Sequence, residues 1–368
     1  MTGGGTGGHV FPALETAKAA RDMGWQVEYL GSLRGQELGA CAKAGMPFIG
    51  FPSLPLVRPL SVQGARTLVL MCKATLMAKR RLQESRPDVV LTMGGYSSAP
   101  IITAAKNLKI PLVVHEQNSV PGRTNLIAAK RAFRICTVFK AAAKHFEKEK
   151  TVRTGMPIRS RLREASFGTL PFNSPWANGR PAVLVMGGSQ GAAALNDVSL
   201  ATAVRMARAG IQWIHLTGEK NYESALEARA KLSVGEDYDI KAFMDEEGMA
   251  EAFSACHMAI CRSGAGTLTE LAAFRRPAIL VPFPRAFADH QRVNAQEFVD
   301  IGAAVMVDQD DLDPAGLEGR VLSWLHDTDL YNEAQKAMAN WDVVDSVSKI
   351  LKVIEEAAAD SDQHGKVK

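Results

Sequence analysis

The sequence predicts an α/β protein with two domains, each built around a parallel sheet. Three observations predict it: short β-rich apolar runs alternate with helical patterns, glycine-rich turns follow strands in both halves, and 368 residues suffice for about two domains. The expected strands are 26–30, 47–51, 88–93, 111–116, 134–139 and 150–155 in the first half, and 182–188, 212–218, 238–243, 257–262, 278–283 and 303–308 in the second.

The domain boundaries follow from composition and periodicity. Proline, glycine, serine and asparagine become frequent from Met156 to Arg180, so we place a linker at the start of this stretch and domains at 1–158 and 159–342. Three helices are expected from residue 313 onward. The last, 343–358, is expected to pack back on the first domain, and the tail after it to fray.

Composition and charge limit the class of protein. With 46% hydrophobic and 22% charged residues the chain is neither disordered nor fibrous, and five cysteines without a CxxC pair argue against a disulfide framework or zinc site. Of 43 Lys/Arg and 39 Asp/Glu, residues 1–163 hold 25 and 9, so that half carries +16 within a net +4. A half this basic predicts an anionic partner.

The first glycine-rich turn, Gly3 to Gly8, matches GxGxxG, with Glu28 twenty residues beyond it. That dinucleotide fingerprint requires a strand directly before it, and only Met1 and Thr2 stand there, so the first domain is expected to lack its first strand. The turn still offers backbone that a bulky substrate can approach and an imidazole, His9, at a helix start.

Two glycine-rich turns in the second half follow strong strands and open helices: 187–191, which contains Ser189, and 263–266. Free N–H groups at a helix start, together with the helix dipole, favour a phosphate. Glu270 comes about one turn into the second of these helices, where a carboxylate can bind a ribose diol, and Gln291 and Asn294 share a helix face suited to sugar hydroxyls.

In the first half, 94–98 and 115–119 both follow strand ends. Four successive polar residues, HEQN at 115–118, are hard to explain as core and indicate a site. Metal chemistry has little support, because the DxD pairs are as frequent as 39 acidic residues predict by chance.

Residues 51–86 combine an apolar loop with a helical pattern. Arg66, Lys73 and Arg80 recur every seven residues, with Lys79 and Arg81 beside them. A basic stripe beside apolar surface suits the interface of an anionic membrane, although an ordinary amphipathic helix with a solvated face has the same pattern.

Seven strings occur here in a fixed order: GGTGGHVFPAL, PDVVLTMGGYSSAP, HEQNSVPGRTN, TGMPIR, VMGGSQGAAALN, CRSGAGTLTELA and DHQRVNA. Together they resemble the MurG family, the UDP-N-acetylglucosamine:lipid I glucosaminyltransferases of bacterial cell-wall synthesis. The resemblance implies a GT-B fold with the donor bound mainly by the second domain, and a peripheral position on the cytoplasmic face of the cell membrane. It also implies a hydrophobic strand before Gly3, and an asparagine where this chain has Met156.

The resemblance assigns a fuller set of site residues, which includes the candidates named above. The catalytic candidates are His9, the first choice as base, and Glu116, and the acceptor-binding candidates are Gly5, Tyr96 and His115. The donor-binding candidates are Thr6, Gly7, Gly8, Asn118, Arg159, Ser189, Gln190, Met244, Ala265, Gly266, Thr267, Glu270 and Gln291. No metal or other cofactor is expected.

The resemblance implies inverting transfer of N-acetylglucosamine from UDP-N-acetylglucosamine to the 4-hydroxyl of an undecaprenyl-diphosphate-linked muramoyl peptide, lipid I. The expected partners are these two substrates and an anionic membrane surface, and no nucleic acid. Alternatives are another GT-B UDP-sugar transferase acting on a glycolipid, a UDP-sugar epimerase of similar fold, an NAD(P)-binding oxidoreductase, or a catalytically inactive membrane-associated scaffold.

Overall fold

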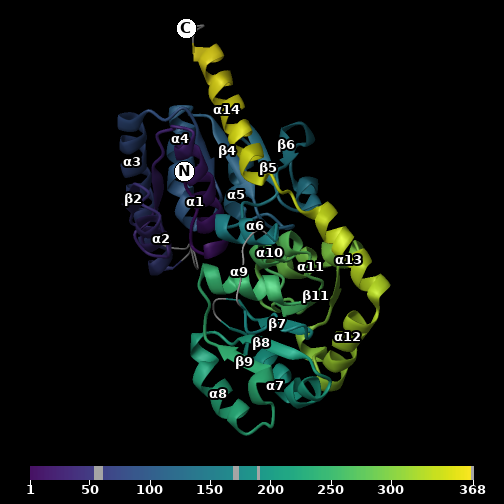
Figure 1. The fold of residues 1–368 in the computed structure, drawn as a ribbon. Coiled ribbons are helices and arrows are strands. Elements are labelled where there is room, and N and C mark those ends of the chain that lie inside the picture. Colours follow the sequence, from purple (N-terminus) through teal and green to yellow (C-terminus); the bar gives the residue numbers. More distant parts are fainter. Residues whose placement is uncertain (54–60, 169–173, 189–190, 366–368) are drawn as a thin grey trace. The chain divides into compact units, whose positions relative to one another are not determined.

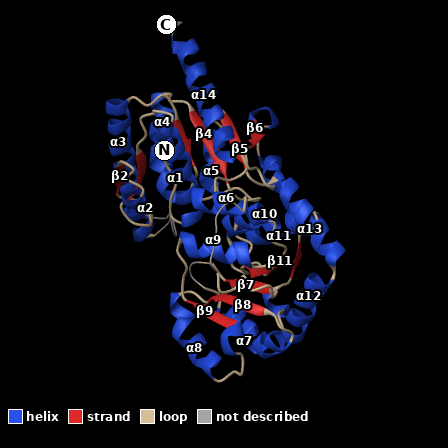
Figure 2. Cartoon of the chain, viewed as in Figure 1, coloured by secondary structure: helices blue, strands red, loops and turns tan. Residues whose placement is uncertain are grey.

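The fold was analysed in a computed structural model, which describes residues 1–53, 61–168, 174–188 and 191–365. It is an α/β structure whose strands are all paired in parallel, as predicted (Figures 1 and 2). Within the described residues, a strand forms inside eleven of the twelve segments predicted from the sequence; the exception is β1, which overlaps the predicted 26–30 only at residues 29 and 30 and continues to residue 32. The strands are β1 (Tyr29–Ser32), β2 (Phe48–Phe51), β3 (Val90–Thr92), β4 (Leu112–Glu116), β5 (Arg134–Thr137), β6 (Thr151–Arg153), β7 (Ala182–Met186), β8 (Gln212–Leu216), β9 (Tyr238–Lys241), β10 (Met258–Cys261), β11 (Ala278–Leu280) and β12 (Ala304–Met306).

Helices connect these strands. They are α1 (Gly7–Asp22), α2 (Glu37–Lys43), α3 (Val62–Ser85), α4 (Ala99–Leu108), α5 (Arg123–Ala129), α6 (Ser160–Ser166), α7 (Ala193–Arg208), α8 (Tyr222–Ala230), α9 (Glu246–Ala255), α10 (Ala265–Phe274), α11 (His290–Asp300), α12 (Pro314–His326), α13 (Thr328–Trp341) and α14 (Ser346–Gly365). Among the helices of the described residues, none combines the length and apolarity needed to cross a bilayer.

Tertiary contacts divide the chain into two compact units. The first unit comprises 1–158 together with 343–368, and the second comprises 159–342. The last helix, α14, packs on α1 of the first unit through buried Ile350, Leu351 and Ile354. It begins at residue 346 and continues to residue 365, so the expectation that the tail 360–368 frays is wrong for residues 360–365, and residues 366–368 lie outside the described residues.

The second unit has one six-stranded sheet in the order β12-β11-β10-β7-β8-β9. From β7 the chain adds β8 and β9 on one side, then crosses to the other side of β7 for β10, β11 and β12. The order therefore reverses between β7 and β10, which are neighbours with Met186 beside Cys261. In open parallel sheets, ligands bind beyond the carboxyl ends of the strands at such a switch point.

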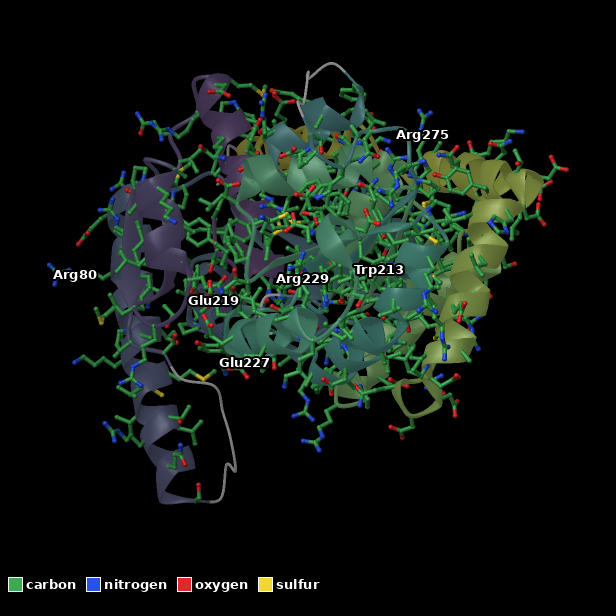
Figure 3. The ribbon with its side chains drawn as sticks, turned by 60° about the horizontal axis from the view of Figure 1, so that its bottom comes forward. Arg80, Trp213, Glu219, Glu227, Arg229 and Arg275 are labelled. Atoms are coloured by element: carbon green, nitrogen blue, oxygen red, sulfur yellow. The ribbon has the colours of Figure 1, made fainter. Side chains whose placement is uncertain are left out.

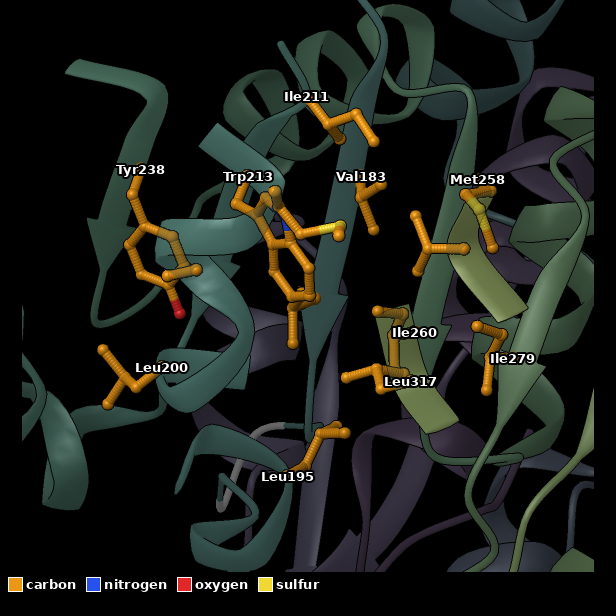
Figure 4. Packing of buried hydrophobic residues seen from close by; sticks show 14 of the residues in the cluster. Val183, Leu195, Leu200, Ile211, Trp213, Tyr238, Met258, Ile260, Ile279 and Leu317 are labelled. Carbon is orange, nitrogen blue, oxygen red and sulfur yellow. The ribbon is translucent and has the colours of Figure 1, made fainter. Parts of the chain in front are cut away.

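Buried apolar residues on its strands place this sheet in the core of the second unit. All five residues of β7 are buried, as expected of a strand covered on both faces. Figure 4 shows Trp213 and Tyr238 beside one another on neighbouring strands, with their rings stacked at a centroid distance of 5.9 Å. Val183 and Ile260 lie in the same core cluster, which holds β7 and β10 in place.

The first unit contains a four-stranded sheet, β3-β4-β5-β6, and a separate pair, β1-β2. Met1 and Thr2 lie between them: Thr2 forms an isolated parallel bridge with Thr92, and the Met1 carbonyl accepts the Leu30 N–H at 2.8 Å. Two residues thus stand in the position of a central strand.

Candidate functional site

The switch point of the second unit is bordered by two helix starts. Because β7 and β10 are adjacent and parallel, the turns that follow them lead into α7 and α10 at the same edge of the sheet. Gly264 precedes α10 in extended backbone with no side-chain cap, and within the described residues Ala192 precedes α7 in the same way. Uncapped first-turn N–H groups and two helix dipoles therefore converge on this edge, which suits a diphosphate.

The turn before α7 requires glycine. Gly188 and Gly191 have φ of +82° and +72°, in the left-handed region. A Cβ on Gly191 would lie 2.4 Å from the Thr217 carbonyl oxygen, which no side chain could tolerate. The predicted donor residues Ser189 and Gln190 lie outside the described residues.

A buried polar chain holds the start of α7. The Asn196 amide donates to the Thr217 carbonyl at 3.0 Å, so its Oδ1 accepts from His215 Nε2, also at 3.0 Å. The other ring nitrogen, Nδ1, then accepts the Tyr238 hydroxyl hydrogen at 2.7 Å. Burial lowers the pKa of His215 to about 3, which keeps this imidazole neutral. The sequence did not indicate Asn196 or His215, because only the fold brings them together.

Glu270 and Arg159, both predicted, form an ion pair within the second unit. The Arg159 guanidinium donates to Glu270 Oε1 at 3.2 Å, and the two side chains are 20% and 17% exposed. Burial raises the pKa of Glu270, and the neighbouring Arg159 opposes that shift. The carboxylate is thus oriented by Arg159, on a side chain that is not fully buried.

The other predicted donor residues of this unit lie at the same edge of the sheet or beside it. Gln291 is held where β11 and α11 meet, since its Oε1 accepts the Phe283 N–H at 2.9 Å and its carbonyl accepts the Ser263 hydroxyl at 2.7 Å. Met244 is buried just beyond β9. The sequence analysis missed the exposed aromatic rings beside these residues, Phe243 (64% exposed) and Phe283 (43%). The remaining predicted residues, Ala265, Gly266 and Thr267, form the first turn of α10.

A cavity of about 300 Å³ lies near Gln291, and Asp289, Arg292 and Asp308 are among its lining residues. Arg292 is already paired with both of these carboxylates. Asp310 and Asp311 add further negative charge to the lining. The negative charge of this cavity would repel a diphosphate. Over the residues that the structure describes, no cluster of acidic, histidine or cysteine side chains could hold a metal ion.

In the first unit, two glycine turns contact each other through their backbones. Gly4 N–H donates to the Gly94 carbonyl at 3.2 Å, and a Cβ on Gly95 (φ +86°) would lie 2.1 Å from the Gly4 carbonyl oxygen. Gly5 N–H also donates to the buried Glu37 carboxylate at 3.2 Å, and the Tyr96 ring lies against Gly5. The turns that carry the two acceptor-binding candidates Gly5 and Tyr96 are therefore in contact.

His9 lies in the first turn of α1. Its Nδ1 is 2.9 Å from the hydroxyl of Thr6, and its side chain is half-buried. The predicted Gly7 and Gly8 stand beside it at the helix start, so the three residues form one polar, accessible corner of this unit. An imidazole oriented by a neighbouring hydroxyl can take a proton from a bound substrate.

His115 and Glu116 both end β4, but both are buried. Since the Gly155 carbonyl can only accept, His115 Nε2 donates to it at 2.8 Å, and Nδ1 accepts from the Gln117 amide at 3.0 Å. Burial lowers the pKa of His115 to about 4. Both ring nitrogens of this neutral imidazole thus already have partners inside the protein.

The Glu116 carboxylate accepts three hydrogen bonds, from Asn118 N–H at 2.9 Å, Gly122 N–H at 3.1 Å and the Asn125 amide at 2.8 Å. Burial raises its pKa, and these three donors oppose the shift. Asn125, which the sequence analysis did not select, also donates to the His115 carbonyl at 3.1 Å. This geometry gives Glu116 a role in shaping the 116–122 loop, on which the predicted donor residue Asn118 lies.

Comparison with known proteins identifies the family. The model of the glycosyltransferase family 28 N-terminal domain matches residues 1–137, and that of the C-terminal domain matches residues 182–352. The chain belongs to glycosyltransferase family 28. This membership covers both units, and it excludes the oxidoreductase alternative that the Gly3–Gly8 fingerprint had left open.

Among family 28 relatives, the chain is 34% identical over 358 residues to UDP-N-acetylglucosamine--N-acetylmuramyl-(pentapeptide) pyrophosphoryl-undecaprenol N-acetylglucosamine transferase of Lactococcus lactis subsp. cremoris (strain MG1363), covering 97% of this chain and 98% of the relative. The protein of the same name from Anaeromyxobacter sp. (strain K) is 38% identical over 317 residues, covering 85% of this chain and 80% of the relative. The crystal structure of Acinetobacter baumannii MurG matches with a TM-score of 0.74 and 29% identity, covering 97% of this chain and 98% of that one. These similarities confirm the predicted family and the GT-B fold.

Proposed function

We propose that this glycosyltransferase transfers N-acetylglucosamine from UDP-N-acetylglucosamine to the 4-hydroxyl of the muramoyl sugar of lipid I, forming lipid II with inversion. The observation that carries the proposal is the pair of uncapped helix starts, α7 and α10, at the switch point of the second unit. Relatives matched over almost the whole chain bear the name of this N-acetylglucosamine transferase.

Three tasks are divided among the residues. The leaving UDP gains negative charge, and the fixed first-turn N–H groups of α10 after Gly264 and of α7 after Ala192 stabilise that charge without a metal ion. The carboxylate of Glu270, oriented by Arg159, accepts hydrogen bonds from the ribose hydroxyls. The acceptor hydroxyl loses its proton as it attacks, and His9 takes it because its imidazole is accessible at a helix start.

The deciding experiment is transfer of radiolabelled N-acetylglucosamine from its UDP donor to lipid I or a short-chain analogue, with and without EDTA. We expect labelled lipid II at equal rates in both conditions. Transfer to other glycolipids but not to lipid I would refute the acceptor assignment. Loss of turnover in EDTA would refute the metal-free assignment.

We also propose that the first unit docks peripherally on the cytoplasmic face of an anionic membrane, through α3. This helix exposes a basic set and an apolar set along its length: Arg66, Lys73 and Arg80, with Leu68, Val69, Leu76 and Met77. Figure 3 shows Arg80 projecting away from the helix. The apolar loop predicted before α3 falls at 54–60, outside the described residues.

Replacing Arg66, Lys73 and Arg80 together with Ser should weaken binding to vesicles rich in anionic lipid by roughly a hundredfold, at about 1 kcal/mol per basic residue. Binding is measured by co-sedimentation. The matched control replaces three exposed basic residues of the second unit, Lys220, Lys231 and Arg275, and should bind as the unaltered chain does. Equal loss in both variants would contradict docking through α3.

A further inference from the structure

Three arginines at alternate positions, Arg159, Arg161 and Arg163, stand at the start of α6 and within it, directly after the chain enters the second unit. Each pairs with a carboxylate on a different element of that unit. The partners, in the same order, are Glu270 of α10, Glu247 of α9 and Asp342, the residue that follows α13. Only the first of these pairs has a part in the transfer reaction proposed for this chain.

The helix that carries these arginines is short. α6 has seven residues, and its buried side chains are Leu162 and Ala165. It packs on α9 and α10 within the second unit (Figure 1). A helix of this length is not stable by itself, so its position depends on the contacts that it makes with its neighbours.

The ion pair between Arg163 and Asp342 is the strongest of these polar contacts. The guanidinium donates twice to the carboxylate, at 2.5 and 3.0 Å, and the two side chains are 15% and 5% exposed. The pair between Arg161 and Glu247 is far more exposed, at 38% and 54%. Exposed pairs contribute little to stability, whereas loss of one partner from a buried pair leaves an uncompensated charge. The pair with Asp342 therefore fixes the position of α6.

The carboxylate side of this pair is itself held firmly. Trp341, the residue before Asp342, is buried and donates its indole N–H to Glu297 of α11 at 2.7 Å. Its ring also packs on that of Phe298, with the ring centroids 4.7 Å apart. Asp342 thus presents a fixed carboxylate to Arg163, which lies in the middle of α6.

We propose that Arg163 and Asp342 are positioning residues for the donor site: by fixing α6, they hold Arg159 where it orients the Glu270 carboxylate. Arg159 directly precedes α6 and lies about one helical turn from Arg163, so a shift of the helix carries its guanidinium along. The guanidinium is 3.2 Å from Glu270 Oε1, at the long end of the range for a hydrogen bond, and a shift of about 1 Å would break this contact. The effect on UDP binding, but not the effect on the carboxylate, rests on the proposed function.

The first measurement needs no ligand. Burial raises the pKa of Glu270 and Arg159 opposes that shift, so the pKa should rise further when Arg159 is no longer held beside the carboxylate. It is followed by NMR of the labelled carboxyl carbon, assigned by its absence in Glu270→Gln. We expect a higher pKa in Arg163→Met. The matched control is Arg161→Met, which removes the exposed pair from the same helix and should leave the pKa unchanged.

The second measurement is calorimetric titration with UDP and with UDP lacking the ribose 2′-hydroxyl. Arg163→Met should bind UDP about 2- to 10-fold more weakly, the equivalent of one ordinary hydrogen bond, and should lose most of the penalty for the missing hydroxyl. Arg161→Met should match the unaltered chain. If the pKa of Glu270 rises in Arg163→Met but the unaltered chain shows no penalty for the missing hydroxyl, the positioning role holds and the ribose assignment of the proposed function fails.

A double variant separates positioning from stability. Arg163→Met leaves Asp342 buried without a partner and should lower Tm, whereas Arg163→Met/Asp342→Leu removes both charges and should restore Tm. The pKa of Glu270 should stay raised in the double variant, because apolar contact lacks the fixed direction of two hydrogen bonds. If Arg163→Met does not fold, the double variant serves for both measurements. A Glu270 pKa equal to that of the unaltered chain in the double variant overturns the proposal, as does an equal rise in Arg161→Met.

Discussion

Replacing Glu270 with Ala should weaken UDP binding by about 10- to 150-fold. The carboxylate is 17% exposed and oriented by Arg159 at 3.2 Å, so it can accept a ribose hydroxyl without first being positioned. A hydrogen bond to a charged group contributes about 1.5–3 kcal/mol, and each 1.4 kcal/mol is tenfold in Kd. We count one such bond, from a ribose hydroxyl to Glu270. The ion pair with Arg159 is not counted, because it is also present in the protein without ligand.

The assay is isothermal titration of UDP and of UDP lacking the ribose 2′-hydroxyl, with the unaltered chain and with Glu270→Ala. If Glu270 binds the diol, the missing hydroxyl should weaken binding to the unaltered chain and have little effect on the variant. Glu227→Ala, which removes an exposed carboxylate of α8, is the matched control and should bind UDP normally (Figure 3).

Two outcomes would refute this reasoning. One is UDP binding by Glu270→Ala within twofold of the unaltered chain. The other is an equal penalty for the missing hydroxyl in both proteins. A lower Tm of the variant would not explain either result, provided that titrations are run well below its unfolding transition.

Three further predictions concern the first unit. His9→Ala should lower kcat by about 10²–10⁴-fold while leaving the Kd for UDP unchanged, and steady-state kinetics with a near-normal rate would remove His9 as the base. Burial lowers the pKa of His115 from 6.5 to about 4, so its imidazole stays neutral in the folded state while the unfolded state takes up a proton. The free energy of unfolding should therefore fall by about 3 kcal/mol more in the unaltered chain than in His115→Gln as the pH falls from about 6.5 to 4. Urea titrations measure this difference, and parallel pH profiles of the two proteins would contradict it. Gly95→Ala should destabilise the protein by about 3 kcal/mol or more, since its Cβ would meet the Gly4 carbonyl, whereas Gly24→Ala, with similar positive φ and open space, should cost about 1 kcal/mol; equal urea midpoints for the two would argue against the contact.

The sequence predicted the strands well because their signal is local. Residues 182–186, for example, are all apolar and are flanked by turns, and both features can be recognised without knowing the rest of the fold. Element ends were less predictable. The last helix extends to residue 365 through a polar stretch that the sequence suggested would fray, because helix continuation there depends on packing further back along α14.

The site was predictable only in part, for a physical reason. The motif strings identified the candidate site residues, such as His9 and Glu270, but not the residues that hold them in place. Asn125 and Asn196 look like ordinary helix residues in sequence, yet Asn125 binds buried polar groups of β4 and Asn196 binds the buried Thr217 carbonyl just beyond β8. Conversely, the sequence HEQN suggested a cluster open to substrate. In the structure, however, both ring nitrogens of His115 form hydrogen bonds inside the protein.

The chain of contacts from Tyr238 through His215 and Asn196 to Thr217 has a consequence for inhibition. It fixes the opening turn of α7 before any ligand arrives, so a nucleotide sugar encounters dipoles that are already aligned and spends little free energy on reorganising them. Among compounds that mimic the departing diphosphate, rigid ones should therefore bind with higher affinity. Flexible analogues with the same charges should bind more weakly, because they lose conformational entropy on binding while the site is already ordered.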